Sequence, residues 1–227
     1  MIVSLTIVRY PKIYIPVAVL AMALHRIPLL FNGKCSFWKL LGSGYGGTFS
    51  LRPDLQQWGL FAVWSSREDF ESFYRRSLIK KWWSTFGSSS WTILCTPLSG
   101  HGKWDGKEPF VFDEDLKDYK GKIAVLTRAT IRPSRLKNFW KNVDAVSRIM
   151  KSSPGYVMSV GVGEAPLYKQ ATFSLWESEE DMKKFAYSSK EHRDVIRKTR
   201  EENWYSEELF ARFKPVEVYE SPAKNNY

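Results

Sequence analysis

The sequence predicts an α+β protein in which two copies of one unit pair as a barrel within a single chain. A segment is repeated, because residues 60–73 and 172–185 agree at six positions with a constant spacing of 112 residues. The segments that flank these two stretches also occur in the same order in both halves. The 227 residues suffice for two units of about 100 residues each. One unit alone would leave a sheet face uncovered, and pairing two such sheets covers both faces.

The repeated positions are aromatic or helix-capping residues. The identical pairs are Phe61 and Phe173, Trp64 and Trp176, Ser66 and Ser178, Glu68 and Glu180, Asp69 and Asp181, and Phe73 and Phe185. The pattern predicts a strand that ends at the tryptophan and a helix that the serine caps, with the aspartate three residues later. The last phenylalanine of the segment falls on the inner face of that helix.

Three further strands and one longer helix are predicted around the repeat in each half. In the first half the strands are at 5–8, 37–44 and 91–94, and a buried helix is at about 13–30. In the second half the strands are at 123–126, 156–163 and 216–219, and a helix at about 133–150 starts with Pro133. Each half therefore has the ferredoxin-like order β-α-β-β-α-β, and the expected fold is the dimeric α+β barrel within one chain.

The same pattern gives the domain boundaries. Residues 1–101 form the first half and residues 122–220 the second. Residues 102–121 are polar and marked by glycine, so we expect a linker there. Residues 221–227 are expected to be a frayed tail.

Composition and charge limit the class of protein and its location. The chain has 34 Lys+Arg and 24 Asp+Glu, a net charge of +10, which favours an acidic partner or is simply a soluble surface. The basic residues of the second half alternate with acidic ones, and this argues against a nucleic-acid partner. The apolar run 13–24 is shorter than the roughly 20 residues that span a membrane. A cytoplasmic protein is therefore expected, and a helix lying on the inner face of the membrane is the alternative.

Few residues are available to hold a metal. Two cysteines exclude a disulfide framework and a cysteine-rich cluster, and three histidines are too few for a multi-histidine centre. The stretch Gly42–Gly47 lacks the lysine of a phosphate-binding loop and is predicted to be a turn or a substrate-lining loop.

His192 is the histidine with the most informative setting. A helix is predicted from Ser188 or Ser189 to about Glu202, and His192 lies on its apolar face. The basic residues of that helix lie on another face: Arg193, Arg197 and Arg200. The imidazole is either a core group bonded to a backbone carbonyl or the single axial ligand of a haem, since a porphyrin supplies four nitrogens itself.

The other candidate ligands have simpler readings. His25 is predicted to close the first helix as a cation at its carboxyl end. His101 is expected in a loop, and Cys95 is expected on a strand, either as a buried, inert residue or as a thiolate haem ligand.

Three segments resemble the spheroidene monooxygenase family of carotenoid biosynthesis. They are residues 37–44 (FWKLLGSG), 91–94 (WTIL) and 197–213 (RKTREENWYSEELFARF), and the likeness runs from Leu5 to about Val218. The part from Trp204 to Phe213 is the most specific.

The resemblance implies a haem protein that uses dioxygen and electrons from a ferredoxin-type donor. It implies one or two hydroxylations at C2 of an acyclic carotenoid such as spheroidene, the second giving a ketone. Related haem barrels bind iron through a histidine on a late helix, which in this sequence is His192. Arg193, Arg197 and Arg200 would then pair with the haem propionates, or otherwise form salt bridges within the helix.

Other readings keep the fold and change the activity. One is a cofactor-free oxygenase or isomerase of the small-barrel monooxygenase type. Another is a non-enzymatic barrel that holds haem or a lipid. The 35 aromatic residues suit an apolar channel for a polyene, although aromatic residues also fill ordinary cores.

Overall fold

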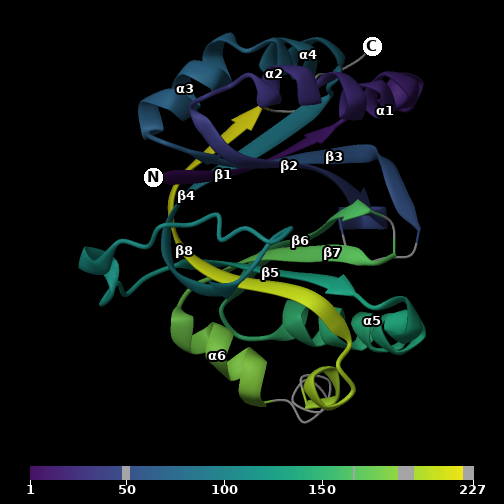
Figure 1. Ribbon diagram of the computed structural model, residues 1–227, viewed down its shortest axis with the longest axis vertical. Coiled ribbons are helices and arrows are strands. Elements are labelled where there is room, and N and C mark those ends of the chain that lie inside the picture. Colours follow the sequence, from purple (N-terminus) through teal and green to yellow (C-terminus); the bar gives the residue numbers. More distant parts are fainter. Residues whose placement is uncertain (48–51, 166, 189–196, 222–227) are drawn as a thin grey trace.

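Eight antiparallel strands close into one barrel, with helices outside it on two opposite sides (Figure 1). The computed structural model describes residues 1–47, 52–165, 167–188 and 197–221. The strands are β1 (Ile2–Arg9), β2 (Cys35–Gly44), β3 (Pro53–Trp64), β4 (Ser89–Gly102), β5 (Ile123–Ile131), β6 (Tyr156–Ala165), β7 (Lys169–Trp176) and β8 (Tyr205–Ser221). The helices are α1 (Ile15–Leu24), α2 (Arg26–Leu30), α3 (Arg67–Arg76), α4 (Leu78–Phe86), α5 (Leu136–Ser152) and α6 (Glu179–Ser188). Residues 197–201 are also helical.

The strand order confirms the tandem α+β barrel. The order around the barrel is β1-β3-β2-β6-β7-β5-β8-β4, so each half supplies four neighbouring strands. One seam is long, with β4 paired to β8 from Ser90 opposite Ser221 to Gly102 opposite Leu209. The other seam is short and joins Gly42 to Gly163 and Ser43 to Val162. The glycine-rich stretch after residue 41 therefore begins as the end of a strand at a seam.

The barrel interior is filled by apolar side chains from both halves and from the segment between them. Residues of β1, such as Leu5, face those of β5, such as Leu126, across this core. Trp104 and Phe110, in the predicted linker 102–121, are buried in the same cluster. The Trp104 ring lies 5.4 Å from Phe37, and the Phe110 ring lies 5.1 Å from Phe213. The connection between the halves is therefore also a plug for the barrel.

The two repeated helices begin as predicted. In α3 the Ser66 hydroxyl accepts a hydrogen bond from the Asp69 amide at 3.1 Å, and Ser178 does the same for Asp181 in α6. Phe73 is buried, whereas Phe185 is half-buried.

The prediction of a buried helix at 13–30 was wrong. The helix is divided at His25 into α1 and α2, and only its side toward the sheet is covered. Ala18, Ala21 and Leu29 are buried there, while most of the larger apolar side chains are exposed. The physical reason is that the segment is apolar on every side, so that a single supporting sheet can cover only part of it.

Candidate functional site

The outer face of the second-half sheet is open at its centre. Thr127 lies in the middle of β5 with its side chain outward, between Thr172 of β7 and Phe210 of β8. Thr127 is exposed, and its two neighbours are half-buried. Above and below it on β5, Val125 and Ala129 are buried. The described helices of this half therefore leave Thr127 accessible at the middle of the sheet.

The first half provides the matched comparison. Ile2 pairs with Trp64 as Ile123 pairs with Trp176, so Thr6 is the counterpart of Thr127. Thr6 is buried, and so are its two neighbours in register, Leu60 and Thr92. The Thr6 and Thr92 hydroxyls are 2.8 Å apart under the helices. The centre of the outer face is therefore buried in the first half and exposed in the second, although both halves have the same fold.

The difference comes from the helices. In the first half, Phe70, Phe73, Ile79 and Trp83 of α3 and α4 are buried against the sheet. Among the described residues of the second half, the cluster between helices and sheet contains two buried helix residues, Met150 of α5 and Met182 of α6, and Val143 of α5 is buried elsewhere. We name the open area around Thr127, Thr172 and Phe210 the outer face of the second half.

The imidazole of His101 borders this outer face. The exposed His101 ring of β4 stacks on Phe210, with ring centres 5.6 Å apart. His101 therefore lies on a strand, and the prediction of a loop was wrong, because β4 extends as far as Gly102 along β8.

The predicted haem-binding residues lie only partly within the described chain. His192 and Arg193 fall outside the described residues. Arg197 lies 3.9 Å from Glu201, a contact within one helix, and Arg200 is exposed. Figure 1 shows α6 and residues 197–201 on the same side of the barrel as α5. The assignment of these four residues to a cofactor stays a prediction.

The remaining candidate ligands are unsuited to a large cofactor. Cys95 faces the barrel interior, where burial raises the pKa of its thiol and keeps it protonated. His25 is buried between α1 and α4, and burial lowers its pKa to about 4. His25 is therefore neutral at pH 7, and the prediction of a cation at the helix end was wrong. Its Nε2 atom has no hydrogen-bond partner among the described residues. The pocket beside it, lined by Tyr10, Met22 and Trp83, is too small for a porphyrin.

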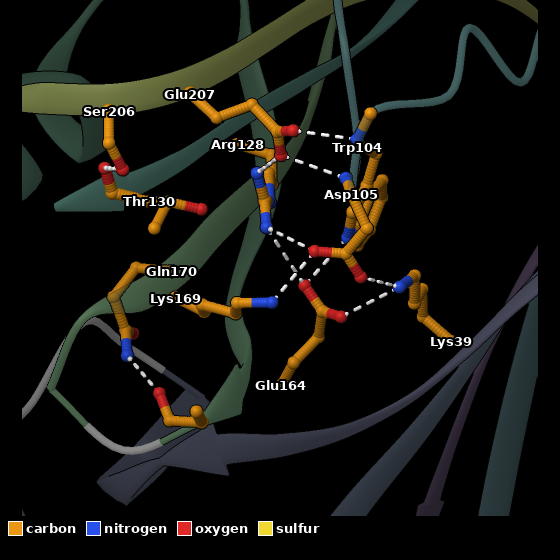
Figure 2. Close-up of polar contacts among 12 residues, drawn as sticks. Lys39, Trp104, Asp105, Arg128, Thr130, Glu164, Lys169, Gln170, Ser206 and Glu207 are labelled. Carbon is orange, nitrogen blue, oxygen red and sulfur yellow. Dashed lines mark hydrogen bonds and ion pairs between the residues drawn. The ribbon is translucent and has the colours of Figure 1, made fainter.

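An ionic cluster surrounds the buried Arg128 (Figure 2). Arg128 of β5 is only 1% exposed and contacts three carboxylates: Asp105 at 3.4 Å, Glu164 at 3.3 Å and Glu207. Lys39 pairs with Glu164 at 2.9 Å, and Lys169 pairs with Asp105 at 2.7 Å. Three cations and three carboxylates make the cluster formally neutral.

This ionic cluster fixes the segment that plugs the barrel. Glu207 accepts hydrogen bonds from the amides of Asp105 and Gly106, both at 2.8 Å. Glu164 accepts one from the Trp104 indole at 2.6 Å. The cations around Asp105 and the hydrogen bonds to Glu207 lower the pKa of both carboxyls, which stay ionised. Because the positive and negative charges compensate one another, we assign the ionic cluster a structural role: it holds residues 104–106 in place.

The sequence reasoning missed both features. Arg128 could have been noticed, because it continues the inward positions of Ala124 and Leu126, two residues beyond the predicted strand 123–126. Thr127 carried no such signal, because the accessibility of its side chain depends on helices elsewhere in the chain. Within the described residues no group of three or more His, Cys, Asp or Glu side chains could hold a metal ion.

The amino-acid sequence of this chain is similar to those of several known proteins. A spheroidene monooxygenase from Cereibacter sphaeroides is 36% identical over 214 residues, which are 93% of this chain and 66% of the relative. One from Rhodobacter capsulatus is 32% identical over 88% of this chain and 83% of the relative. One from Rubrivivax gelatinosus is 33% identical over 84% and 73%. The chain belongs to the spheroidene monooxygenase family. It spans about two thirds of the length of the Cereibacter relative, and the residues 121–213 also match a domain of unknown function, DUF3291.

Solved structures confirm the fold of this spheroidene monooxygenase family member. An aldoxime dehydratase in complex with butyraldoxime has a TM-score of 0.64 and 9% identity, covering 98% of this chain and 82% of the other. A second aldoxime dehydratase has a TM-score of 0.60 and 10% identity, covering 96% and 83%. At such identities the likeness concerns the dimeric α+β barrel alone.

Proposed function

We propose that this protein is a haem-dependent monooxygenase that oxidises C2 of an acyclic carotenoid, and that the outer face of the second half holds the haem. The observation that carries the site is the exposure of Thr127, where its counterpart Thr6 is buried. Membership of the spheroidene monooxygenase family supports the substrate class and the use of dioxygen.

The residues of the outer face suit a flat apolar group. Phe210 offers a half-buried ring. Thr127 and Thr172, at the centre of the outer face, are small enough to leave room above the sheet. His192 is the proposed axial ligand, and one protein ligand suffices for a porphyrin. Arg193, Arg197 and Arg200 would hold the propionates by charge-assisted hydrogen bonds.

Bound haem would supply the activation of dioxygen, while the chain positions the substrate and excludes water. Each hydroxylation consumes one dioxygen, two electrons and two protons, and it leaves one water. A second hydroxylation at C2 followed by loss of water gives the ketone. Aromatic side chains near the face, Phe210 and Phe185, would orient the polyene end by apolar contact.

The electrons come, in this proposal, from a ferredoxin-type donor. The net charge of +10 favours docking of an acidic protein, because complementary charge speeds encounter. Such docking predicts that turnover with the donor falls as salt rises.

Absorption spectra test the proposal. Protein expressed with a haem supply should show a Soret band, and His192→Ala should remove or shift it. Thr127→Phe should lower the haem content several-fold by filling the open face, whereas the isosteric Thr127→Val should not. Both Thr127 variants should keep the wild-type melting temperature within a few degrees, because the side chain is exposed.

Other results would change the assignment. A wild type that stays colourless after reconstitution would leave a cofactor-free oxygenase of the same fold. A Soret band unchanged by His192→Ala would move the ligand, with His101 at the edge of the face as the next candidate. Haem retained with no turnover of an acyclic carotenoid would leave a binding protein.

A further inference from the structure

The helices α1 and α2 present a broad apolar surface away from the barrel. Ile13 is 80% exposed, Ile27 56%, Leu30 69% and Phe31 85%. Val19, Leu20 and Leu24 are exposed on the same segment. We name this set of exposed residues between Ile13 and Phe31 the N-terminal apolar surface. Large contiguous apolar patches mark interaction sites in proteins.

The conformation of the apolar segment determines whether it can cross a membrane or lies on a surface. The stretch Lys12–Leu30 is long and apolar enough, by length and composition alone, to cross a membrane, with 22% of it buried. In the structure it is divided at His25 and lies along the barrel. Its inward side buries Ala18 and Leu29 in the core beneath the helices. Crossing a membrane would remove these contacts, so the surface is suited to lie on a bilayer.

The charges around the segment identify the kind of partner. Residues 1–53 contain no Asp or Glu and six cations. Arg9 and Lys34 pair with carboxylates elsewhere in the fold, and Lys39 belongs to the ionic cluster. Lys12 is exposed directly before the apolar segment and Arg26 is exposed at the start of α2, and within the described part of the chain neither forms an ion pair. Lys81 of the adjacent α4 is also exposed.

We propose that the N-terminal apolar surface docks this protein on an anionic lipid bilayer, with α1 and α2 in the plane of the interface. Apolar side chains would enter the acyl boundary, and Lys12, Arg26 and Lys81 would contact anionic headgroups. Surface helices of this kind combine apolar burial with attraction to anionic lipid. The proposal does not depend on the reaction, because it concerns the half of the barrel opposite the open outer face.

The same charges argue against a second copy as the partner. A two-fold interface would place the same patch on both sides. It would therefore bring Lys12 and Arg26 toward the cations of the other copy, with no acidic residue in residues 1–53 to pair with them. A bilayer that contains anionic lipid supplies the missing negative charge.

Vesicle flotation tests the proposal on the full chain. Vesicles of phosphatidylcholine with about 30 mol% phosphatidylglycerol should carry the wild type to the top of a gradient, and pure phosphatidylcholine should carry much less. The double variant Ile27→Glu/Leu30→Glu should reduce the floated fraction at least about five-fold. The double variant Lys12→Glu/Arg26→Glu should reduce binding to the vesicles that contain phosphatidylglycerol and leave binding to pure phosphatidylcholine vesicles unchanged.

A matched double variant controls for general effects of added charge. Val111→Glu/Val157→Glu places two glutamates at exposed apolar positions outside α1 and α2, and it should float like the wild type. Circular dichroism and the melting temperature show that each variant is folded. Equal flotation of wild type and Ile27→Glu/Leu30→Glu would overturn the proposal. So would a wild type that does not float and forms a dimer that the same variant separates, since the surface would then be an interface between copies.

Discussion

Arg128 shows how one residue can connect distant parts of this chain. Its guanidinium contacts carboxylates from the plug segment, from β6 and from β8. Its Nε atom has no partner among the described residues. A buried cation of this kind is tolerated because the carboxylates compensate its charge.

Removal of that cation should destabilise the fold. Arg128→Met leaves Asp105, Glu164 and Glu207 with two lysines between them, so we expect a loss of about 3–5 kcal/mol in the free energy of unfolding. Urea denaturation measures this loss. Arg128→Lys keeps the charge and should lose less. A loss under about 1 kcal/mol for Arg128→Met would show that the cluster does not stabilise the barrel.

His25 should make stability depend on pH. Its pKa is lowered to about 4 in the folded protein, below the value near 6.5 of an exposed histidine. Protonation therefore favours the unfolded chain, so stability should fall as the pH drops from about 6.5 to 4 and be unaffected by this group above that range. The total loss should be about 3 kcal/mol.

The variant His25→Leu isolates that contribution. Its free energy of unfolding should stay nearly constant between pH 6.5 and 4.5, while that of the wild type falls. Carboxylates with lowered pKa, such as Glu207, lose their contribution at lower pH, below about 4.5. Parallel curves for the two proteins over the upper range would refute the assignment to His25.

At the scale of elements, the segment between the halves differs most from its expected character. Residues 102–121 were predicted as a polar linker, and most of them are exposed or half-buried. Yet Trp104 and Phe110 are in the barrel core, and positive φ angles at Asp105 and Gly106 turn the chain between them. A short polar segment can therefore plug a barrel with two aromatic anchors.

Truncation of the first anchor tests this role. Trp104→Ala should cost about 3–5 kcal/mol of stability, because it leaves a cavity in the barrel and removes a hydrogen bond to Glu164. Limited proteolysis should then cut residues 105–120 faster. Val111→Ala, at an exposed position in the same segment, should change stability by less than about 0.5 kcal/mol. Equal proteolysis of both variants would contradict the plug.

At the scale of the whole molecule, the two halves share a fold and differ in how their helices cover the sheet. The first half buries Phe70 and Phe73 from α3, whereas Met182 is the one buried side chain among the described residues of the corresponding α6. This asymmetry leaves one outer face sealed and the other open. The two halves thus share one backbone arrangement, and different side chains on their helices leave one of them with an exposed candidate site.

Hydrogen exchange should report the asymmetry directly. Amides of α3 should exchange more slowly than those of α6, by an order of magnitude or more, because fewer buried side chains hold α6 to the sheet. Amides of β3 and β7 should be similarly protected, since both strands lie within the barrel. Equal protection of α3 and α6 would show that the smaller number of buried side chains does not weaken the attachment of α6 to the sheet.

The sequence by itself determined the repeated unit, the strand–helix order and the two serine caps. These depend on local periodicity and on contacts three residues apart, as at Ser66 with Asp69. Tertiary structure alone decided that Trp104 enters the barrel, that α1 and α2 lie half-uncovered, and that Thr127 is open where Thr6 is sealed. The reason is physical: exposure is set by what packs above a residue, and those partners lie far away in the chain.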